Sequence, residues 1–344
     1  MTRKNFNTIH YMRLMACLFV VLIHVTATPV VALTTNSLPQ YLFIFINQLS
    51  KPAVPIFLFI SGFLLHHLYS DKKINLIQFY KKRLPKLVGP YVLWSLGYYL
   101  IYVKLGYYPI DFKFVLEGLL WGTFIYHLYF MVILIQLYIL YPLLHFINTK
   151  LGTTKLFIIL LAIQLFLIKV PFEHRDRIFI TYQSYFAFGM LIREWYSKVA
   201  FEQIPPILSG SLFGLVGILN SLVYLNYQNG WFNLPSIINS LVYIDFSLSS
   251  ILILFVLFES FDRRMDKGAV SIKKYKLERQ LSLYSESTEF IYYAHPLVII
   301  GSEFILNRVG IISISLRAAI NFSLIVIILV PLSLWINSRK RIGA

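Results

Sequence analysis

Ten apolar stretches, each near the length that crosses a bilayer, constrain this chain more than any other feature. A helix needs about 20 mostly apolar residues to cross the hydrocarbon core. The stretches are 11–33, 41–69, 84–104, 125–146, 154–171, 178–195, 206–227, 236–260, 286–306 and 312–336. We therefore predict an all-α integral membrane protein with a bundle of about ten transmembrane helices. We expect residues 1–344 to form a single membrane domain without an appended soluble domain.

Composition excludes the other broad classes. The chain is 58% hydrophobic and 13% charged, whereas a soluble domain has about 45–50% apolar and about 25% charged residues. Disordered segments are poor in apolar residues, so disorder is excluded as well. The single cysteine, Cys17, rules out a disulfide framework and a Cys-rich zinc site. We expect no bound metal.

The basic residues predict how the helices are oriented. The chain has 31 Lys and Arg against 15 Asp and Glu. With a cytoplasmic N-terminus, 22 of these cations fall on the inner side and 8, including Lys51, on the outer side, while Arg13 lies at the inner end of the first helix. This bias follows the positive-inside rule. It predicts a cell-membrane protein with both termini in the cytoplasm. Nucleic acid binding is then not needed to explain the positive charge. We expect the basic segment 262–285 to attract anionic membrane lipids first and to help capture the donor second.

Two basic side chains share one face of the first predicted helix. A charged group inside a membrane span costs about 2.5–3.5 kcal/mol, so such residues are candidates for function. Arg13 and His24 are 11 residues apart, which is about three turns and about 16 Å along the axis. Arg13 would lie at the cytoplasmic mouth and His24 near the midplane, an arrangement that suits a long phosphorylated donor. A snorkelling arginine and a structural histidine are the alternatives.

Five motifs, taken in order along the chain, resemble the integral-membrane acyltransferase-3 family. The segment 11–17, continued to His24, is similar to its Arg-x10-His signature. The other four are Val54 to Leu65 in the second helix, the basic segment Tyr80 to Lys86, His127-Leu128-Tyr129-Phe130, and Tyr292-Tyr293-Ala294-His295-Pro296. Two positions depart from the family pattern: Lys86 replaces a second arginine, and Pro55 stands where many members have aspartate. The Val-Pro start of the second motif suggests the subgroup of surface-polysaccharide O-acyltransferases and intercellular-adhesin proteins.

This resemblance implies transfer of an acyl group, usually acetyl, from cytoplasmic acyl-CoA to a hydroxyl on the far side of the membrane. The acceptor would be a surface glycan or its lipid-linked precursor, and glycan-synthesis machinery would be a possible partner. Acyl-CoA is then a donor substrate, and no cofactor is bound permanently. Some larger relatives carry a C-terminal hydrolase-like domain. Without one, this chain would deliver the acyl group directly or pass it to a separate protein.

Physical chemistry suggests a role for each candidate residue. His24 would be the general base, because an imidazole titrates near neutrality. Arg13, Arg83 and Lys86 would bind the CoA phosphates at the inner mouth. Lysine lacks the bidentate fork of arginine, so a contact from Lys86 would be weaker. Ordinary positive-inside anchoring is the alternative for Arg83 and Lys86.

The remaining candidates lie in later helices or near the outer face. His295 would orient the acyl carbonyl or His24, with a packed core histidine as the alternative; the adjacent Pro296 loosens the helix. His127 would border the acceptor or be an ordinary interfacial histidine. Glu303 and Lys51 would pair with each other or meet the acceptor. The role of Asp245 is left open.

Two other functions fit the same ten helices. One is export of a polysaccharide or small solute, which internal repeats would favour; no clear repeat is visible. The other is a non-catalytic partner of a glycan synthase. The sequence has no Walker loop, no dinucleotide-binding glycine fingerprint, no His-Glu-x-x-His and no Gly-x-Ser-x-Gly. ATP-driven pumping, zinc proteolysis and serine hydrolysis therefore have no support.

Overall fold

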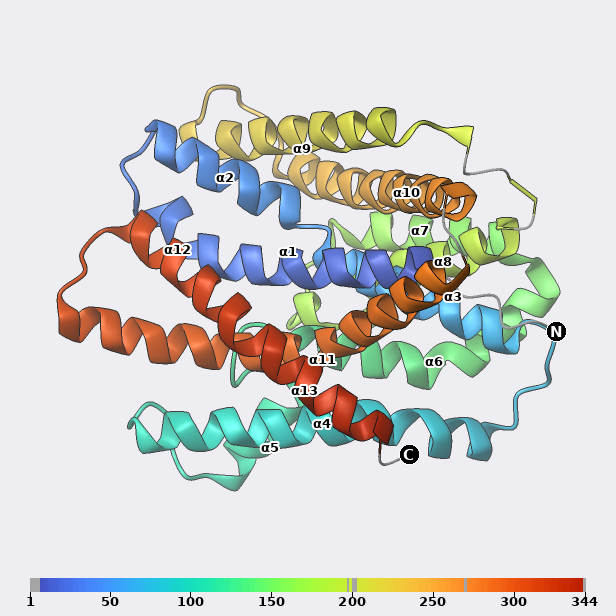
Figure 1. The fold of residues 1–344 in the computed structure, drawn as a ribbon, viewed down its shortest axis with the longest axis horizontal. Coiled ribbons are helices and arrows are strands. Elements are labelled where there is room, and N and C mark those ends of the chain that lie inside the picture. The colour runs from blue at the N-terminus through green and yellow to red at the C-terminus, as the bar shows by residue number, and fades with distance from the viewer. Residues whose placement is uncertain (1–6, 197, 200–202, 269–270, 343–344) are drawn as a thin grey trace. The chain divides into compact units, whose positions relative to one another are not determined.

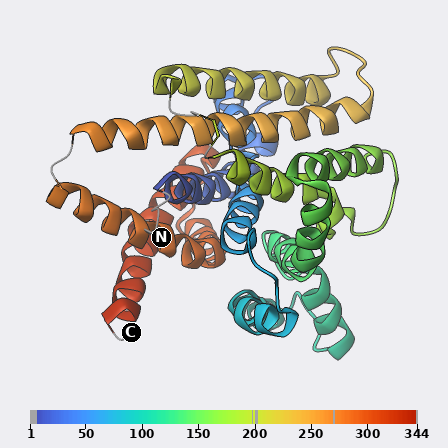
Figure 2. The same cartoon turned by 90° about the vertical axis from the view of Figure 1, so that its right-hand side faces the viewer.

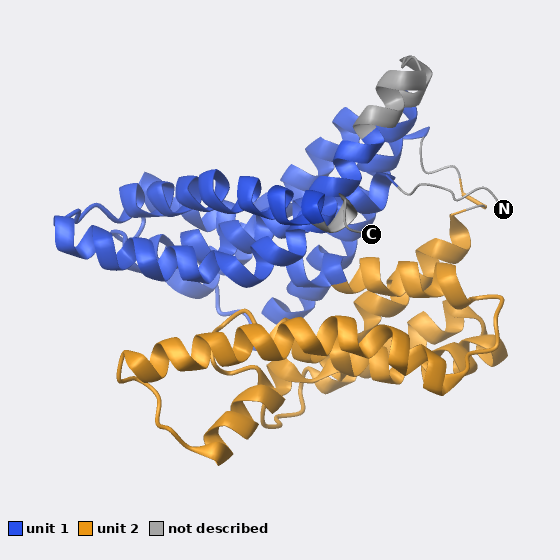
Figure 3. Ribbon diagram, turned by 60° about the horizontal axis from the view of Figure 1, so that its bottom comes forward, with its two compact units in different colours: residues 1–57, 200–344 blue, residues 58–199 orange. Residues whose placement is uncertain are grey.

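Every regular element in the described part of the chain is helical (Figure 1). The structure is a computed structural model, and it describes residues 7–196, 198–199, 203–268 and 271–342. The chain divides into two compact units (Figure 3). Unit 1 comprises residues 1–57 and 200–344, and unit 2 comprises residues 58–199. Each unit is described by itself.

Unit 1 is built around its first helix. α1 (Asn7–Ala32) packs against α2 (Leu38–Ser50), α10 (Ser236–Gly268), α11 (Ser271–Val309) and α12 (Ile314–Leu324). After α12, a π-helical turn (Ile325–Leu329) leads into α13 (Val330–Ile342), which returns along α11. α9 (Pro206–Asn229) lies beside α10 and also contacts α2 (Figures 1 and 2). The core of this unit is therefore a central helix enclosed by four others.

α1 and α11 run parallel, which is the feature that positions the candidate site. Arg13 Nη1 lies 3.5 Å from Ser285 Oγ, and Cys17 Sγ lies 3.8 Å from the carbonyl oxygen of Thr288. Residue numbers rise together along both helices at these contacts, so the two helices point the same way in register. Side chains at equal distances along them therefore lie at the same level.

α10 runs antiparallel to α1 and closes the opposite side of its first turns. Thr8 Oγ1 donates to Glu259 Oε2 at 2.8 Å, and Asn7 Nδ2 donates to Asp262 Oδ1 at 3.0 Å. Hydrogen bonds to charged carboxylates are stronger than neutral ones, at about 1.5–3 kcal/mol. These two bonds hold the start of α1 in place.

Unit 2 packs a second set of helices around a very close crossing. Its helices are α3 (Ala53–Tyr69, which begins in unit 1), α4 (Leu76–Lys104), α5 (Phe112–Trp121), α6 (Tyr129–Leu151), α7 (Thr153–Leu167) and α8 (Gln183–Trp195). Two short 3-10 turns, Arg175–Arg177 and Phe179–Thr181, precede α8. A Cβ atom built on Gly62 of α3 would lie 1.9 Å from the Phe186 carbonyl oxygen, and one on Gly189 of α8 would lie 2.0 Å from that of Phe59. The backbones of α3 and α8 thus touch directly, and only glycine fits at either position.

The helices identify the chain as a multi-pass membrane protein. Within the described residues, seven segments are long and apolar enough to cross a bilayer: Asn7–Ala32, Leu38–Tyr69, Tyr129–Leu151, Pro206–Asn229, Ser236–Arg264, Glu278–Val309 and Ile314–Arg339. Three of the ten predicted stretches do not appear among them. The stretch 84–104 lies within α4, whose first turns carry Lys81, Lys82, Arg83 and Lys86; 154–171 and 178–195 contain the short helices α7 and α8.

Three helix boundaries differ from the ends of the apolar stretches, for identifiable reasons. The first was visible in the sequence, where Lys51, Pro52 and Pro55 interrupt the stretch 41–69. The helix stops after α2 and resumes as α3, because proline has no backbone N–H to continue the ladder. The segment 262–285, expected to be a loop, is mostly helical, since α10 extends to Gly268 and α11 starts at Ser271. Apolar patterns locate the membrane part of a helix but not the polar turns that prolong it.

The third difference is α5, a helix of ten residues where we expected only a loop. Its start is capped by Asp111, whose side chain accepts a hydrogen bond from the Phe114 backbone N–H at 2.6 Å. It ends at Gly122, which has φ +64°, a conformation that glycine adopts without a Cβ penalty. Arg177 Nη1 donates to the carbonyl oxygens of Trp121 and Gly122 at 2.8 and 3.1 Å. Arg177 therefore stabilises a helix C-terminus.

Candidate active site

Two imidazole rings stack between α1 and α11. The ring centroids of His24 and His295 are 5.1 Å apart, and their planes differ by 23°. His295 is fully buried and His24 is half-buried. The parallel register of the two helices places the rings at one level, so the structure brings together two of the predicted site residues.

Backbone carbonyls hold the His295 ring. Its Nδ1 atom lies 2.7 Å from the carbonyl oxygen of Tyr292 and 3.2 Å from that of Ile291. A carbonyl oxygen only accepts hydrogen bonds, so Nδ1 is the donor in both contacts. The Tyr292 ring also packs against that of His295, with centroids 6.4 Å apart. The orientation of His295 is thus set by its own helix.

Lys51, which we counted among the cations of the outer side, lies near the same rings. It occupies the break between α2 and α3, and its side chain is half-buried. One turn earlier, Asn47 Nδ2 donates to the Ile23 carbonyl oxygen at 3.1 Å and to Thr26 Oγ1 at 2.8 Å. These bonds fix the end of α2 against the middle of α1. Lys51 consequently lies within electrostatic range of His24.

Arg13 lies on α1 nearer its N-terminus than His24. Its guanidinium is half-buried, and Nη1 lies 3.5 Å from Ser285 Oγ. Along the helix it is about 16 Å from His24. Unit 1 therefore has an arginine near one end of the α1/α11 pair and two imidazoles and an ammonium group deeper along it.

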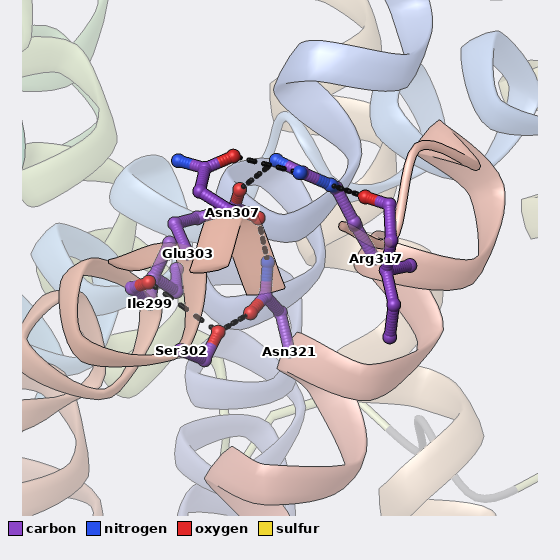
Figure 4. Close-up of polar contacts among 7 residues, drawn as sticks. Ile299, Ser302, Glu303, Asn307, Arg317 and Asn321 are labelled. Atoms are coloured by element: carbon purple, nitrogen blue, oxygen red, sulfur yellow. Dashed lines mark hydrogen bonds and ion pairs between the residues drawn. The ribbon is translucent and has the colours of Figure 1, made fainter. Parts of the chain in front are cut away.

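Glu303 takes part in a polar network of its own (Figure 4). Arg317 Nη1 donates to Glu303 Oε2 at 2.9 Å, and Asn321 Nδ2 donates to Oε1 at 2.7 Å. Arg317 Nη2 also reaches Asn307 Oδ1 at 2.7 Å. We expected Glu303 to pair with Lys51 or to meet the acceptor, but its ion pair is with Arg317. Arg317 follows it by 14 residues, and the turn between α11 and α12 brings the two together.

The other three predicted site residues belong to unit 2. Arg83 Nε donates to the Tyr69 hydroxyl at 3.2 Å, and its guanidinium lies 5.4 Å from the centre of that ring. Lys86 is exposed on the same helix. His127, expected to face an acceptor, is only 2% exposed and packs edge-on against Tyr98, with centroids 5.7 Å apart. In this structure His127 is a core residue of unit 2.

Several polar neighbours of these residues were not predicted from the sequence. Three polar residues lie on the same face of α11 as His295, because successive members are three or four residues apart. They are Ser285, Thr288 and Tyr292. That spacing was visible in the sequence. In unit 2, the Nε and Nη2 atoms of Arg193 lie 3.0 and 2.8 Å from His67 Nδ1; no local pattern signals this pair, because α3 and α8 are far apart in the chain.

Acidic residues and possible metal ligands remain to be placed. Asp245, whose role was left open, is exposed on α10. Among the residues that the structure describes, no group of three or more His, Cys, Asp or Glu side chains could hold a metal ion. The paired imidazoles of unit 1 and the nearby cations suit proton transfer beside a phosphorylated ligand.

Comparisons with known proteins identify one family. Residues 6–337 match a family model, acyltransferase family 3, that is described as an acyltransferase domain. The match covers nearly the whole chain. Searches of curated proteins and of solved structures found no significant match.

Proposed function

Because this chain belongs to the acyltransferase-3 family, and is thus a membrane acyltransferase, we propose that it acylates a glycan of the cell surface. The donor would be cytoplasmic acyl-CoA, in the first instance acetyl-CoA, and the acceptor a hydroxyl of the glycan or of its lipid-linked precursor. The family match favours this enzyme over the transporter and the non-catalytic synthase partner. The subgroup of surface-polysaccharide O-acyltransferases is part of the proposal.

The observation that carries the proposal is the stacked pair of His24 and His295 in unit 1. Two ionisable side chains within membrane helices are costly. His24 lies on the helix that also carries Arg13, and His295 lies on the parallel neighbour of that helix. Arginine binds phosphate oxygens bidentately. A donor anchored through its phosphates near Arg13 would extend its acyl group along the α1/α11 pair toward the imidazoles.

In the proposed reaction, His24 acts as the general base. It takes the proton from the acceptor hydroxyl while the hydroxyl oxygen attacks the thioester carbon of acyl-CoA. A carbon–oxygen bond forms and the carbon–sulfur bond breaks. The departing CoA thiolate then takes the proton back from the imidazolium. One ester and one thiol result, and the protein is unchanged.

The membrane topology belongs to the same proposal. With ten crossings and both termini in the cytoplasm, α1 starts at the donor side, so Arg13 would meet CoA there. The basic residues of 262–285 would hold this side against anionic lipid. The cell membrane is the location that gives a cytoplasmic donor and an external acceptor access to one enzyme.

The deciding experiment compares His24→Ala with His10→Ala. Both substitutions remove an imidazole from α1, but His10 lies near its first turn. Each protein is reconstituted in vesicles with acetyl-CoA and the extracted glycan, and acetyl groups on the glycan are counted by mass spectrometry. We expect His24→Ala to lower the rate by at least about 10²-fold, whereas His10→Ala keeps it, with equal amounts of protein in the membrane.

Undiminished glycan acetylation by His24→Ala would overturn the proposed mechanism. Movement of unmodified glycan across the vesicle membrane without consumption of acetyl-CoA would favour the transporter. Normal glycan synthesis in a strain carrying His24→Ala, together with loss of synthesis in a deletion strain, would favour the synthase partner.

A further inference from the structure

Pro296 changes the hydrogen bonding of α11 next to the stacked imidazoles. The ring of proline lacks a backbone N–H, so it removes the bond that residue 296 would make to the carbonyl four residues earlier. That carbonyl belongs to Tyr292. In a membrane, a backbone carbonyl that loses its partner must find another donor nearby.

His295 supplies that donor. Its Nδ1 atom lies 2.7 Å from the Tyr292 carbonyl oxygen, with a second, longer contact of 3.2 Å to Ile291. The Ile291 carbonyl already accepts the ordinary helical bond from the His295 backbone N–H. The Tyr292 carbonyl receives no such bond, because Pro296 has no N–H, and it can therefore accept the shorter bond from His295 Nδ1. Because both partners are carbonyls, the proton of the neutral ring must sit on Nδ1.

We infer that Pro296 is a positioning residue that fixes His295 as the Nδ1–H tautomer and thereby makes its Nε2 atom a proton acceptor. An imidazole orients an acyl carbonyl by donating an N–H to its oxygen. The N–H of the neutral His295 ring is already used by the backbone. Orienting the acyl carbonyl, one of the roles predicted for His295, is therefore replaced by accepting a proton beside His24.

The inference rests on the proposed acyl transfer and specifies how its proton moves. The proton that leaves the acceptor hydroxyl goes to an imidazole nitrogen of the pair and reaches the thiolate sulfur when the carbon–sulfur bond breaks. His295 gives the pair a second basic nitrogen of defined position. Its bond to the Tyr292 carbonyl also stabilises the charged ring, in the way that an oriented acceptor supports the catalytic histidine of hydrolases.

The tautomer is measurable without any assay of activity. ¹⁵N-histidine is incorporated into the protein in lipid nanodiscs, and the His295 signals are assigned as those lost in His295→Gln. Chemical shifts of the two ring nitrogens separate the tautomers. We expect the protonated nitrogen of His295 to be Nδ1. A neutral ring protonated on Nε2 would overturn the inference, whatever the enzyme does.

Pro296→Ala tests the cause. The new N–H would bond to the Tyr292 carbonyl and compete with the His295 ring, so we expect the Nε2–H tautomer to become populated. The kcat of acetyl transfer should fall by about tenfold or more, since the wrong tautomer costs up to about 10⁴-fold in other histidine-dependent enzymes. The KM for acetyl-CoA should stay within about twofold, because the donor contacts are unchanged.

Pro142→Ala is the matched control, because Pro142 also lies inside a helix, α6, but follows a tyrosine. It should leave both the His295 tautomer and kcat unchanged. An unaltered His295 tautomer in a folded Pro296→Ala protein would show that Pro296 does not set the tautomer. If that variant does not fold, the wild-type spectrum still decides the tautomer. A wild-type protein that ignores acetyl-CoA would refute the proposed function and leave the tautomer measurement standing.

Discussion

The paired imidazoles of unit 1 differ from ordinary core histidines in what surrounds them. A structural histidine would be expected among apolar side chains. His24 instead faces a second imidazole and lies within range of the Lys51 ammonium group. A proton taken up by either ring would meet the positive charge of Lys51, and like charges at close range repel. Titratable groups gathered in this way are typical of sites whose chemistry uses them.

Arg13 is the residue whose proposed role is easiest to separate from anchoring. We predict that Arg13→Ala raises the KM for acetyl-CoA by about tenfold, because a charge-assisted hydrogen bond contributes about 1.5–3 kcal/mol. Arg13→Lys should restore part of the loss, since lysine keeps the charge without the planar fork. Initial rates at varied acetyl-CoA concentration, with protein in vesicles, provide the measurement.

Lys82→Ala serves as the control for Arg13, because Lys82 is an exposed cation of α4. It should not change the KM. An Arg13→Ala protein with a normal KM but a reduced amount in the membrane would identify Arg13 as an interfacial anchor and nothing more.

Among the helices, the crossing of α3 and α8 is the most demanding contact. Phe186 and Phe59 place their carbonyl oxygens where a Cβ of Gly62 or Gly189 would lie. Such an overlap with backbone cannot be relieved by turning a side chain, so the helices would have to separate. The two glycines fix how closely α3 and α8 approach.

We predict that Gly62→Ala and Gly189→Ala each destabilise the protein by about 3 kcal/mol, at the upper end of the usual overpacking range. Thermal unfolding of the purified protein in detergent would show a melting temperature lower by several degrees. Gly97→Ala, in α4 of the same unit, has nothing within 4 Å of the new methyl group and should not be destabilising. Equal melting temperatures for all three variants would contradict the close crossing.

Helix positions were predictable from the apolar stretches, whereas helix ends were not. The break at Lys51 and Pro52 was visible as an interruption, yet only the packing of Asn47 against α1 placed Lys51 beside His24. α5 escaped prediction because its ten residues are too few to span a membrane, and its ends depend on Asp111 and on the distant Arg177.

For the whole molecule, orientation in the membrane decides which end of α1 meets the donor. We predict that the loop 33–37 lies outside and the loop 70–75 inside. In a Cys17→Ser background, Thr35→Cys should react with an impermeant maleimide added to intact cells. Lys73→Cys should react only after permeabilisation. Both positions are exposed, while the natural thiol, Cys17, is buried.

The reverse labelling pattern would place the start of α1, and with it Arg13, on the outer face. A CoA donor would then have no access to Arg13, and the direction of the proposed transfer would be wrong. Labelling from both sides at either position would mean that the protein inserts in two orientations, against the bias of its cations.

Properties that arise from neighbouring residues were predictable from the sequence alone. Length and apolarity specify membrane helices, and a spacing of 11 residues puts Arg13 and His24 on one face because helix geometry is local. The packing of distant helices set which faces meet. It paired His24 with His295 through the parallel packing of α1 and α11, and Glu303 with Arg317. The fold also set the Nδ1 contacts of His295. Such contacts depend on how helices far apart in the chain pack, or on how a side chain turns toward its own backbone. Local sequence patterns predict neither.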